Sequence, residues 1–526
     1  MQYQIDAFKM KVNEKKTLKE AVCLKYHLRS CDVTVLSRSI DARDKTDIQY
    51  VYRLLVQTDE KLSGKQVRRY IEQSVFLKYP SWSCSKPPVV VGFGPSGMFA
   101  ALYLARCHAK PIIIERGKKA SERQNDIERF FKDKILDENS NIQFGEGGAG
   151  TFSDGKLTTN RKDPLNRFLL EEMVKHGAPD DILWDAMPHI GTDYLIKMVQ
   201  QIRQEIIALG GTFYFETCFC DAFFNEDSWT VCCRSNEKEY TFSTEHLLLG
   251  IGHSAKDTLR YLYRKMQLHM EPKSFSMGVR IEHPRQWIDT IQYGAFRESL
   301  PAAYYKLAHH SKDRGIYTFC MCPGGVVVAS ASEPKTIVTN GMSDHNRGGR
   351  NSNSALLVEV RPSDYVQKSV LDGLDFQEKY ERLAFQVSGD YRAPANLVRE
   401  FLNDEVAHSL RSVLPSYPHG IVLADLRTCL PDFVIAGLKE GLIALDRKMN
   451  GFAHPDAVLT GIESRSSCPV RIVRDETHQA SRKGIYPIGE GAGYAGGIMS
   501  AALDGLKTAI QIANKNKEEK TLDHAV

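Results

Sequence analysis

Alternating apolar and polar positions open the chain and predict a small separate module over residues 1–80. Three segments alternate as half-buried strands do, and two others place apolar residues at the spacing of a helix face. The predicted strands are 3–12, 33–37 and 48–57, and the predicted helices are 18–28 and 64–77. The stretch KYPSWSCSKPP that follows contains three prolines, which interrupt helices and central strands, so we expect a linker there.

From Pro88 onward the pattern changes to short apolar runs, glycine turns and helical segments, which predicts an α/β fold. We expect a mixed parallel sheet with helices on both faces, and an inserted domain rich in strands such as 325–331 and 356–360. The predicted parts are an N-terminal α+β module at 1–80, a discontinuous α/β domain at 86–265 and 456–515, and an inserted β-rich substrate or cap domain at 266–455.

The stretch PVVVGFGPSGMFAALYLA has the parts of a dinucleotide pyrophosphate site. Three valines predict a buried strand, Gly92 allows a tight turn, Gly94 lets the backbone approach phosphates, and Gly97 lets the next helix pack closely. That helix begins with Pro95 and Ser96, and its amide groups and dipole point at the anion. A second apolar strand ends at Glu115, which is placed to accept hydrogen bonds from a ribose, and Arg116 follows it.

Two further glycine segments favour FAD over NAD. In FGEGGAGTFSDGKL, successive backbone amides can form an anion nest and Lys156 can add a cation. In GIYPIGEGAGYAGGIMS, the acid Glu490 follows a short strand, and a new helix begins near Gly497. An acid there can hold the ribityl chain, and the helix amides can stabilise negative charge on a reduced flavin ring. NAD sites do not need this third segment.

The chain resembles a bacterial group of FAD-dependent dehydrogenase-like proteins with a glutathione-reductase-type, Rossmann-like FAD domain and an extra N-terminal module. The resemblance rests on VVVGFGPSGMFAALYLA, FGEGGAGTFSDGKLTT, LLLGIGHSAKDT, FSMGVRIEHP, FCMCPGGVVV, GIESRSSCPVRI and YPIGEGAGYAGGIMSAALDG. It implies non-covalent FAD, with Phe219 in a strand at 212–223 bracketing the adenine through its backbone. Glu490 stands where the wider superfamily often has aspartate, which puts its contact with the ribityl chain in doubt. The expected cofactor-binding residues are Gly92, Gly94, Pro95, Ser96, Gly97, Glu115, Arg116, Gly145, Gly147, Gly148, Ala149, Gly150, Lys156, Phe219, Gly252, Gly489, Glu490, Gly496, Gly497 and Ile498.

The segment GIGHSA at 250–255 could be a second fingerprint for a nicotinamide domain. No apolar strand ending in an acid follows at the required distance, because the next candidate stops at Pro272. The resemblance implies instead that Gly252 closes the FAD domain. We therefore expect no dedicated NAD(P)H domain, and NAD(P)H stays open as a transient reductant.

Four residues are candidates for catalysis. His253 follows a strand that should end near the flavin, although a structural histidine has the same sequence signature. Cys320 and Cys322 could exchange electrons with the flavin, or be buried small hydrophobic residues. Arg465 could bind an anionic substrate, or form an internal ion pair with Glu463 or another carboxylate.

Composition narrows the remaining classes. A net charge of +4 from 69 basic and 65 acidic residues favours neither nucleic acid nor an anionic membrane as the main partner. The 12 cysteines have irregular spacings, so we expect no metal site and no disulfide framework. No stretch resembles a secretory signal or a membrane span, so we expect a cytoplasmic protein that acts on a small molecule. The oligomeric state is not indicated.

These patterns together predict an FAD-dependent oxidoreductase that transfers hydride between an unknown organic substrate and the flavin. Two alternatives remain open. One is a non-catalytic flavin-binding regulatory or interaction protein. The other is an RNA-modifying flavoprotein, for which the basic residues of the N-terminal module would supply the RNA contact.

Overall fold

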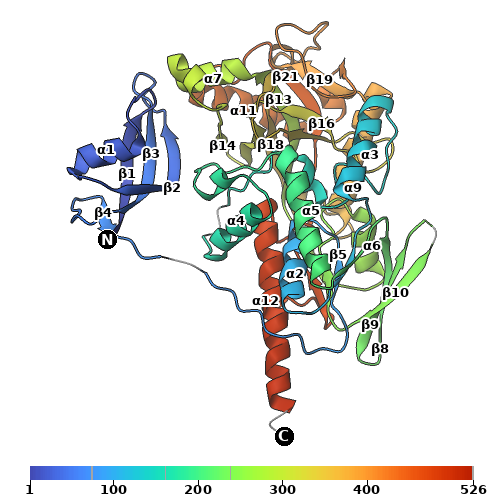
Figure 1. Ribbon diagram of the computed structural model, residues 1–526. Helices are drawn as coiled ribbons and strands as arrows, with labels where there is room; N and C mark the ends of the chain where they lie inside the picture. The colour runs from blue at the N-terminus through green and yellow to red at the C-terminus, as the bar shows by residue number, and fades with distance from the viewer. Residues whose placement is uncertain (73–74, 160–161, 237, 524–526) are drawn as a thin grey trace.

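The computed structural model describes residues 1–72, 75–159, 162–236 and 238–523, and the N-terminal module stands at one side of it (Figure 1). A four-stranded sheet in the order β2-β3-β1-β4 and one helix form this module. Thr17 caps the helix through a reciprocal pair of hydrogen bonds with Glu20. The elements are β1 (Gln2–Lys11), α1 (Leu18–Tyr26), β2 (Asp32–Asp41), β3 (Gln49–Gln57) and β4 (Val67–Arg69).

The helix predicted at 64–77 is wrong. Residues Val67–Arg69 form the edge strand β4, which pairs with β1 in antiparallel register. The sheet edge offered by β1 supplies backbone partners that a short isolated helix lacks, so tertiary pairing overrides the local helical pattern. Residues 73–74 of the predicted helix lie outside the described residues.

A five-stranded parallel sheet in the order β23-β11-β5-β6-β7 forms the centre of the next part of the chain. Each strand has only three residues, and the three central strands are almost entirely buried. Their apolar runs do not alternate because both faces of the sheet are covered. The strands are β5 (Val89–Val91), β6 (Ile112–Ile114), β7 (Thr212–Tyr214), β11 (Leu247–Leu249) and β23 (Ile485–Pro487).

The two faces of this sheet belong to different hydrophobic cores. Val90 and Leu248 face a core built with α2 (Pro95–Arg106), α5 (Thr192–Ala208) and α12 (Ile498–Asp523). Residues on either side of them, including Val89 and Leu247, face a core built with a three-stranded sheet and α6. The elements of that second layer are β8 (Cys218–Asn225), β9 (Ser228–Arg234), β10 (Glu239–Thr244) and α6 (Lys256–Arg264).

The single strand predicted at 212–223 is two strands in different sheets. Residues Thr212–Tyr214 are β7 of the parallel sheet, and the chain then turns at Glu216, which has a positive φ, into β8. The apolar run continues through the turn because both strands partly bury aromatic side chains, Phe213 in β7 and Phe219 in β8. Sequence pattern alone therefore joins them.

A mixed seven-stranded sheet, in the order β14-β15-β18-β13-β21-β19-β20, forms the inserted domain above the first sheet (Figure 1). The two longest strands, β13 and β18, are buried along nearly their whole lengths. The predicted boundary at residue 456 falls before β21, whose strand partners are β13 and β19 of this sheet. The strands are β13 (Phe275–Pro284), β14 (Ala308–His310), β15 (Gly315–Cys322), β18 (Asn351–Val360), β19 (Ala393–Leu397), β20 (Ile421–Leu423) and β21 (Val458–Glu463).

Helices and short hairpins complete the fold. Side chains of α11 and α9 pack into the core of the seven-stranded sheet. The remaining elements are α3 (Ala120–Asp133), η1 (Gly148–Phe152), α4 (Leu165–Lys175), η2 (Asp180–Leu183), β12 (Met270–Pro272), α7 (Arg285–Tyr293), η3 (Gly294–Ser299), β16 (Val326–Ala329), β17 (Thr339–Met342), α8 (Pro362–Tyr365), α9 (Asp372–Ser388), α10 (Val398–Leu402), η4 (Leu426–Thr428), α11 (Asp432–Lys448) and β22 (Val470–Ile472).

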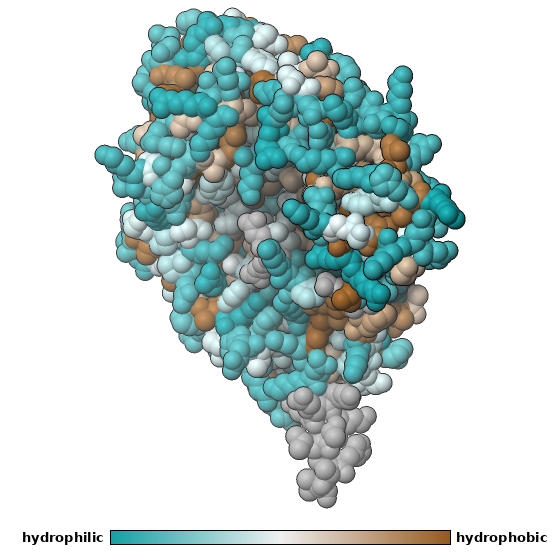
Figure 2. All heavy atoms as spheres, turned by 90° about the vertical axis from the view of Figure 1, so that its left-hand side faces the viewer, coloured by the Kyte–Doolittle hydropathy of each residue, from teal (hydrophilic) through white to brown (hydrophobic). Residues whose placement is uncertain are grey.

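The N-terminal module contacts the rest of the chain through Arg38 of β2. The Arg38 N–H donates to the backbone oxygen of Trp184, and the N–H of Ala186 donates back to Arg38. The Arg38 guanidinium lies 3.1 Å from Asp185 Oδ2 and 4.5 Å from the Trp184 ring. The face on this side of the molecule is mainly hydrophilic, with small scattered hydrophobic groups (Figure 2). Among the described residues, none of the helices has the length and apolarity that a bilayer crossing demands.

Acidification should destabilise the seven-stranded sheet through His283 of β13. Burial lowers the pKa of His283 to about 4, from an ordinary value of 6.5. Because the folded pKa lies below the unfolded one, stability is complete above pH 6.5 and falls as the pH drops toward 4. The full difference corresponds to roughly 3 kcal/mol.

Urea unfolding at neutral pH and at about pH 5 measures this effect. His283→Asn should lose less stability on acidification than the wild type, since its amide can still donate to the Phe452 oxygen that His283 Nε2 contacts at 2.7 Å. Equal losses in the two proteins would contradict the role of His283.

Candidate functional site

The turn after β5 brings three backbone segments into close contact. Gly92 has a φ of +90°, and a Cβ on it would lie 2.3 Å from the backbone oxygen of Gly250. A Cβ on Gly97 would lie 2.0 Å from the oxygen of Gly92, so only glycine lets α2 pack on the turn. Helix α2 begins at Pro95 with no side-chain cap, which leaves its first amides and its dipole for a ligand.

The second glycine segment packs directly on the first. A Cβ on Gly148, whose φ is +63°, would lie 2.9 Å from Gly94 Cα. A Cβ on Gly150 would lie 3.2 Å from the side chain of Ile498, the first residue of α12. The loop at 145–150 therefore lies between the amino ends of α2 and α12.

The third glycine segment closes the arrangement from the other side. A Cβ on Gly489 would lie 2.4 Å from Ser96 Oγ, and one on Gly491 would lie 2.5 Å from the oxygen of Gly252. A Cβ added to Gly252, Gly496 or Gly497 would meet no heavy atom within 4 Å, so space remains beside these three glycines. Ten predicted residues thus meet in one region: Gly92, Gly94, Pro95, Ser96, Gly97, Gly148, Gly150, Gly252, Gly489 and Ile498.

Glu115 sits at the end of β6 and is buried. Its carboxylate accepts hydrogen bonds from the amides of Phe93, Gly117 and Gly145, at 2.9 to 3.0 Å. Two of these bonds reach Oε1, so Oε2 keeps capacity for another donor. Arg116 lies beside it, paired with Asp257 at 2.8 Å and stacked over the Phe144 ring at 4.4 Å.

Arg123 of α3 holds the second glycine segment, and sequence reasoning missed it. Its guanidinium is fully buried and donates to the backbone oxygens of Asn141, Ile142, Glu146 and Gly148 at 2.7 to 3.0 Å. The sequence did contain a signal for a buried arginine. Arg123 lies four residues before Ile127, so the two side chains share the apolar face of the helix.

A second missed pair supports the third segment. Asp504 of α12 accepts a hydrogen bond from the amide of Gly489 at 2.8 Å. Arg474 donates to the same carboxylate at 3.0 Å and to the backbone oxygen of Pro487 at 2.8 Å. Both side chains of this ion pair are almost fully buried. Their hydrogen bonds to the backbone therefore hold the turn after β23 in a single conformation.

His253 and Glu490 meet at the edge of this region. His253 follows β11, Glu490 follows β23, and His253 Nδ1 lies 3.0 Å from Glu490 Oε1. The other ring nitrogen, Nε2, is buried and has no hydrogen-bond partner among the described residues. A carboxylate on Nδ1 favours the tautomer with hydrogen there, which leaves the Nε2 lone pair for a ligand. Glu490 therefore has a protein partner, and its contact with a ribityl chain stays a prediction.

Phe219 and Lys156, two further predicted cofactor residues, have different neighbours. Phe219 is in β8, two residues after Thr217, whose amide donates to the backbone oxygen of Glu115. Lys156 pairs with Asp154 at 3.0 Å, and Asp154 also binds Arg347. Burial opposes ionisation of Asp154, but the two cations outweigh it and hold the pKa of this carboxyl well below its usual range. Lys156 is thus neutralised by a protein carboxylate.

Cys320 and Cys322 lie together at an irregularity in β15. Cys320 has a positive φ of 42°, and its backbone oxygen accepts hydrogen bonds from Arg280 at 2.7 Å and from the Cys322 thiol at 3.3 Å. Cys322 Sγ lies 3.9 Å from Lys156 Nζ. Burial raises the pKa of Cys320 to about 12 and also raises the pKa of Cys322. Both side chains are therefore thiols at neutral pH, and their redox role stays a prediction.

Arg465 is the centre of a buried ion cluster. Its guanidinium lies 2.8 Å from Glu381 and 2.9 Å from Glu333, and Lys256 contacts the same two carboxylates. The predicted alternative of an internal ion pair is therefore present, but not with Glu463, which binds Arg280. Arg465 Nη1 also lies 3.1 Å from Ser254 Oγ, next to His253.

A cavity of about 490 Å³ opens beside Gly496, between β13, β15 and the third glycine segment. Ser276 Oγ and Tyr317 Oη are 2.7 Å apart on its wall, and Ser466 Oγ binds the backbone of Ser276. The lining residues are Ser274, Phe275, Ser276, His310, Gly315, Tyr317, Phe319, Glu359, Ser466, Ser467 and Gly496. Aromatic rings with a few hydroxyl groups suit a small organic molecule.

Known proteins resemble this chain at several levels. Residues 274–466, which span the strands β13 to β21, match the family described as FAD-dependent protein, C-terminal domain-like. An uncharacterized protein of Clostridium beijerinckii is 45% identical over 518 residues, covering 95% of this chain and 96% of that protein.

Two solved structures show distant likenesses. A flavoprotein/dehydrogenase from Cytophaga hutchinsonii is 12% identical over 82% of this chain and 79% of its own, with a TM-score of 0.35. A geranylgeranyl bacteriochlorophyll reductase-like protein from Thermoplasma acidophilum is 10% identical over 83% and 79%, with a TM-score of 0.37. At these values neither structure informs the activity of this chain.

Replacing Arg123 with methionine should loosen the second glycine segment. Four backbone oxygens would lose the Arg123 donor, and of these the Glu146 oxygen keeps a bond from the Thr151 hydroxyl, so we expect the free energy of unfolding to fall by about 3 kcal/mol. Urea denaturation measures the change. Arg129→Met is the matched control on the same helix, since that side chain is 46% exposed and should cost no more than about 0.5 kcal/mol. Similar losses in both variants would exclude a special role for Arg123.

Proposed function

This chain belongs to the same family as the uncharacterized Clostridium beijerinckii protein, and its residues 274–466 match a family of FAD-dependent proteins. We propose that it holds FAD at the three converging glycine segments and works as an oxidoreductase. The carrying observation is the contact of Gly94 with Gly148 and of Gly150 with Ile498, which gathers two helix amino ends and an amide-rich loop. Such ends attract the pyrophosphate of a dinucleotide. The finer assignment to a glutathione-reductase-type FAD domain is part of the proposal.

The residues of the chain fit the parts of FAD. The uncapped amides at the start of α2 would hold the pyrophosphate, and Glu115 would accept from a ribose through its remaining capacity. The start of β8, with Phe219, adjoins Glu115 and would hold the adenine end. The start of α12 at Ile498, beside the open space at Gly496 and Gly497, would hold the ring end. When bound, FAD supplies the hydride-transfer chemistry.

We place the organic substrate in the cavity beside Gly496. Its walls come from the inserted domain, and its edge comes from the segment assigned to the ring end of the cofactor. The hydroxyls of Ser276 and Tyr317 can orient a polar group, and the rings of Phe275 and Phe319 can pack on an apolar one. A cavity with both polar and apolar groups on its wall favours a small-molecule substrate.

His253 is the candidate for proton transfer within this proposal. Glu490 orients the ring through Nδ1, and Nε2 is left to accept or donate a proton at that atom. Ser254, the next residue, is bound by Arg465, so the buried ion cluster helps to position the histidine. Arg465 is therefore a positioning residue for His253. Its guanidinium already binds two carboxylates, which leaves few free N–H groups for an anionic substrate.

The RNA-modifying alternative receives less support. Seven of the described basic residues in the N-terminal module already have acidic partners within the chain, which reduces their attraction for phosphates. These pairs are Lys9–Asp41, Lys11–Asp47, Lys19–Asp32, Arg38–Asp185, Arg43–Asp41, Arg53–Asp6 and Arg68–Asp6.

Flavin content tests the cofactor site. Gly148→Ala should lower the bound flavin at least tenfold, equivalent to roughly 1.4 kcal/mol, because the new Cβ pushes against Gly94 Cα. Gly389→Ala is the matched control, since Gly389 has a similar φ of +72° but no heavy atom within 4 Å of the added Cβ. Visible absorbance of the purified proteins measures the flavin. Full retention in Gly148→Ala would refute the site.

Photoreduction under anaerobic conditions, followed by a screen of organic oxidants, tests turnover. With a substrate in hand, His253→Gln should keep its flavin and slow the reaction roughly 100-fold, and the pH dependence of the rate should change. His408→Gln, at an exposed position, should leave the rate unchanged. A flavin that no substrate reoxidises would favour the non-catalytic regulatory alternative.

A further inference from the structure

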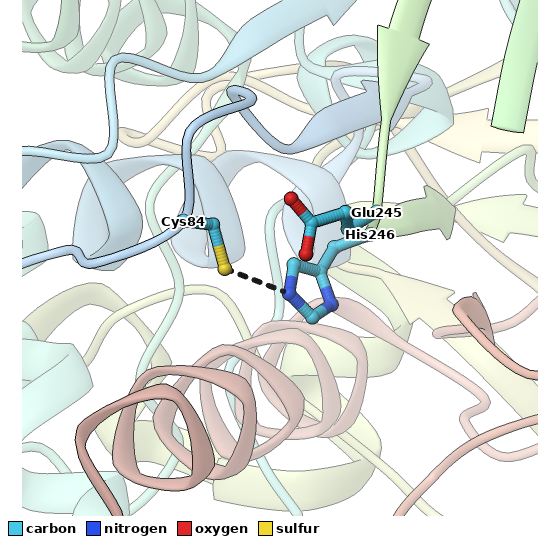
Figure 3. Close-up of side chains that lie close together, drawn as sticks. All are labelled: Cys84, Glu245 and His246. Atoms are coloured by element: carbon cyan, nitrogen blue, oxygen red, sulfur yellow. Dashed lines mark hydrogen bonds between the residues drawn. The ribbon is translucent and has the colours of Figure 1, made fainter. Parts of the chain in front are cut away.

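Cys84, Glu245 and His246 lie together at the opposite end of the central sheet from the glycine turns (Figure 3). Cys84 comes from the linker after the N-terminal module, and the other two residues immediately precede β11. Cys84 Sγ is 3.6 Å from His246 Nε2, and one ligand atom from each residue lies within 4.8 Å of the others. Figure 3 shows all three side chains pointing toward a common point.

We propose that these three side chains bind a zinc ion. Zinc bonds of about 2.3 Å to sulfur and about 2.0 Å to nitrogen, at a tetrahedral angle, separate the two ligand atoms by about 3.5 Å. The observed separation of 3.6 Å matches this value. A thiolate, an imidazole and a carboxylate are ligands that favour zinc over magnesium or calcium, which prefer oxygen alone. The fourth position is left for water.

The surroundings orient the ligands before an ion arrives. His246 Nδ1 lies 3.3 Å from Tyr486 Oη, which directs Nε2 toward Cys84. The ring of Trp82 meets the His246 ring edge-on at 5.5 Å between centroids. Backbone bonds hold the two chain segments together, since the amide of Val89 donates to the oxygen of His246, and Thr244 Oγ1 donates to the oxygen of Pro87. Binding therefore requires little reorganisation.

A simple hydrogen bond between the thiol and the imidazole is the competing explanation of the short distance. It accounts for Cys84 and His246 but gives no reason for the Glu245 carboxylate to join them. The irregular cysteine spacing predicts no metal site. Cys84 and His246 are 162 positions apart in the sequence, so no short motif relates them. Only the fold brings them together.

The proposed ion would tie the linker to the two residues immediately before β11. It would do so at the amino ends of the parallel strands, whereas the glycine turns follow their carboxyl ends. A three-residue strand places these ends about 10 Å apart, so the zinc site and the flavin site are separate. Loss of the ion should leave flavin content unchanged and make the linker more sensitive to protease.

Metal analysis of the full-length protein, after incubation with zinc and removal of loosely bound ions, tests the proposal. We expect about one equivalent in the wild type and less than a tenth of that in the double variant Cys84→Ser/His246→Gln. The control Cys220→Ser/His310→Gln removes the same residue types from exposed positions and should keep its zinc. Less than a tenth of an equivalent in the wild type would overturn the site, as would equal zinc in both double variants.

Cobalt titration of the wild type gives a second readout that does not depend on the folding of any variant. Tetrahedral cobalt bound to a thiolate absorbs at longer wavelengths than oxidised flavin, so its bands remain visible in the yellow protein. We expect saturation at one equivalent, and roughly tenfold weaker binding in Tyr486→Phe because the histidine loses its orienting partner. Absence of the cobalt bands would also overturn the proposal, whatever the flavin content.

Discussion

The close approach of peptide backbones around Gly94 is the constraint on which the rest of the structure depends. Three segments that are far apart in the sequence meet there with no room for a side chain at Gly97, Gly148 or Gly489. The first and third segments can meet because the parallel strands β5, β11 and β23 are neighbours, so the turns that follow them lie at one edge of the sheet. The second segment follows no strand of this sheet, and Arg123 holds its backbone oxygens. Two helix amino ends then point into the same region.

Buried ions hold this region in register with the inserted domain. Arg465 follows β21 of the large sheet, Lys256 begins α6, and both bind Glu381 of α9. Burying such charges is costly unless each has partners, and removing one partner leaves the others uncompensated. Here each charged side chain has at least two partners of opposite charge. These pairs favour one orientation of the two sheets relative to each other. The cavity beside Gly496 is lined by residues of both parts, with Ser466 next to Arg465 in the chain.

The two ends of the central sheet have different chemistry. The carboxyl end offers amides and helix dipoles, which suit a large anion. The amino end offers a thiol, an imidazole and a carboxylate, which suit a small cation. The two sites share β11, so the short strand that ends beside the glycine turns also begins beside the proposed zinc ligands.

The local parts of the first glycine turn could be predicted from the sequence alone. Strand, turn, helix and terminal acid follow one another within about 25 residues, and each depends mainly on neighbours in the chain, so the pattern of Val89–Val91, Gly92 and Glu115 was readable. The sequence also predicts a helix that begins near Gly497 and a strand-rich insert at 266–455. In the structure α12 begins at Ile498, and β21, which lies beyond that range, belongs to the sheet of the insert. The helix expected at 64–77 failed because a neighbouring strand edge decided its conformation.

Which charged side chains meet could not be predicted from the sequence, because these contacts depend on how distant elements pack. Arg123 with the oxygens of the second loop, His253 with Glu490, and Arg465 with Glu381 are contacts between residues that local sequence does not relate. The physical reason is that a glycine turn is specified by steric limits within a few residues, whereas an ion pair or hydrogen bond is specified by which distant elements pack side by side.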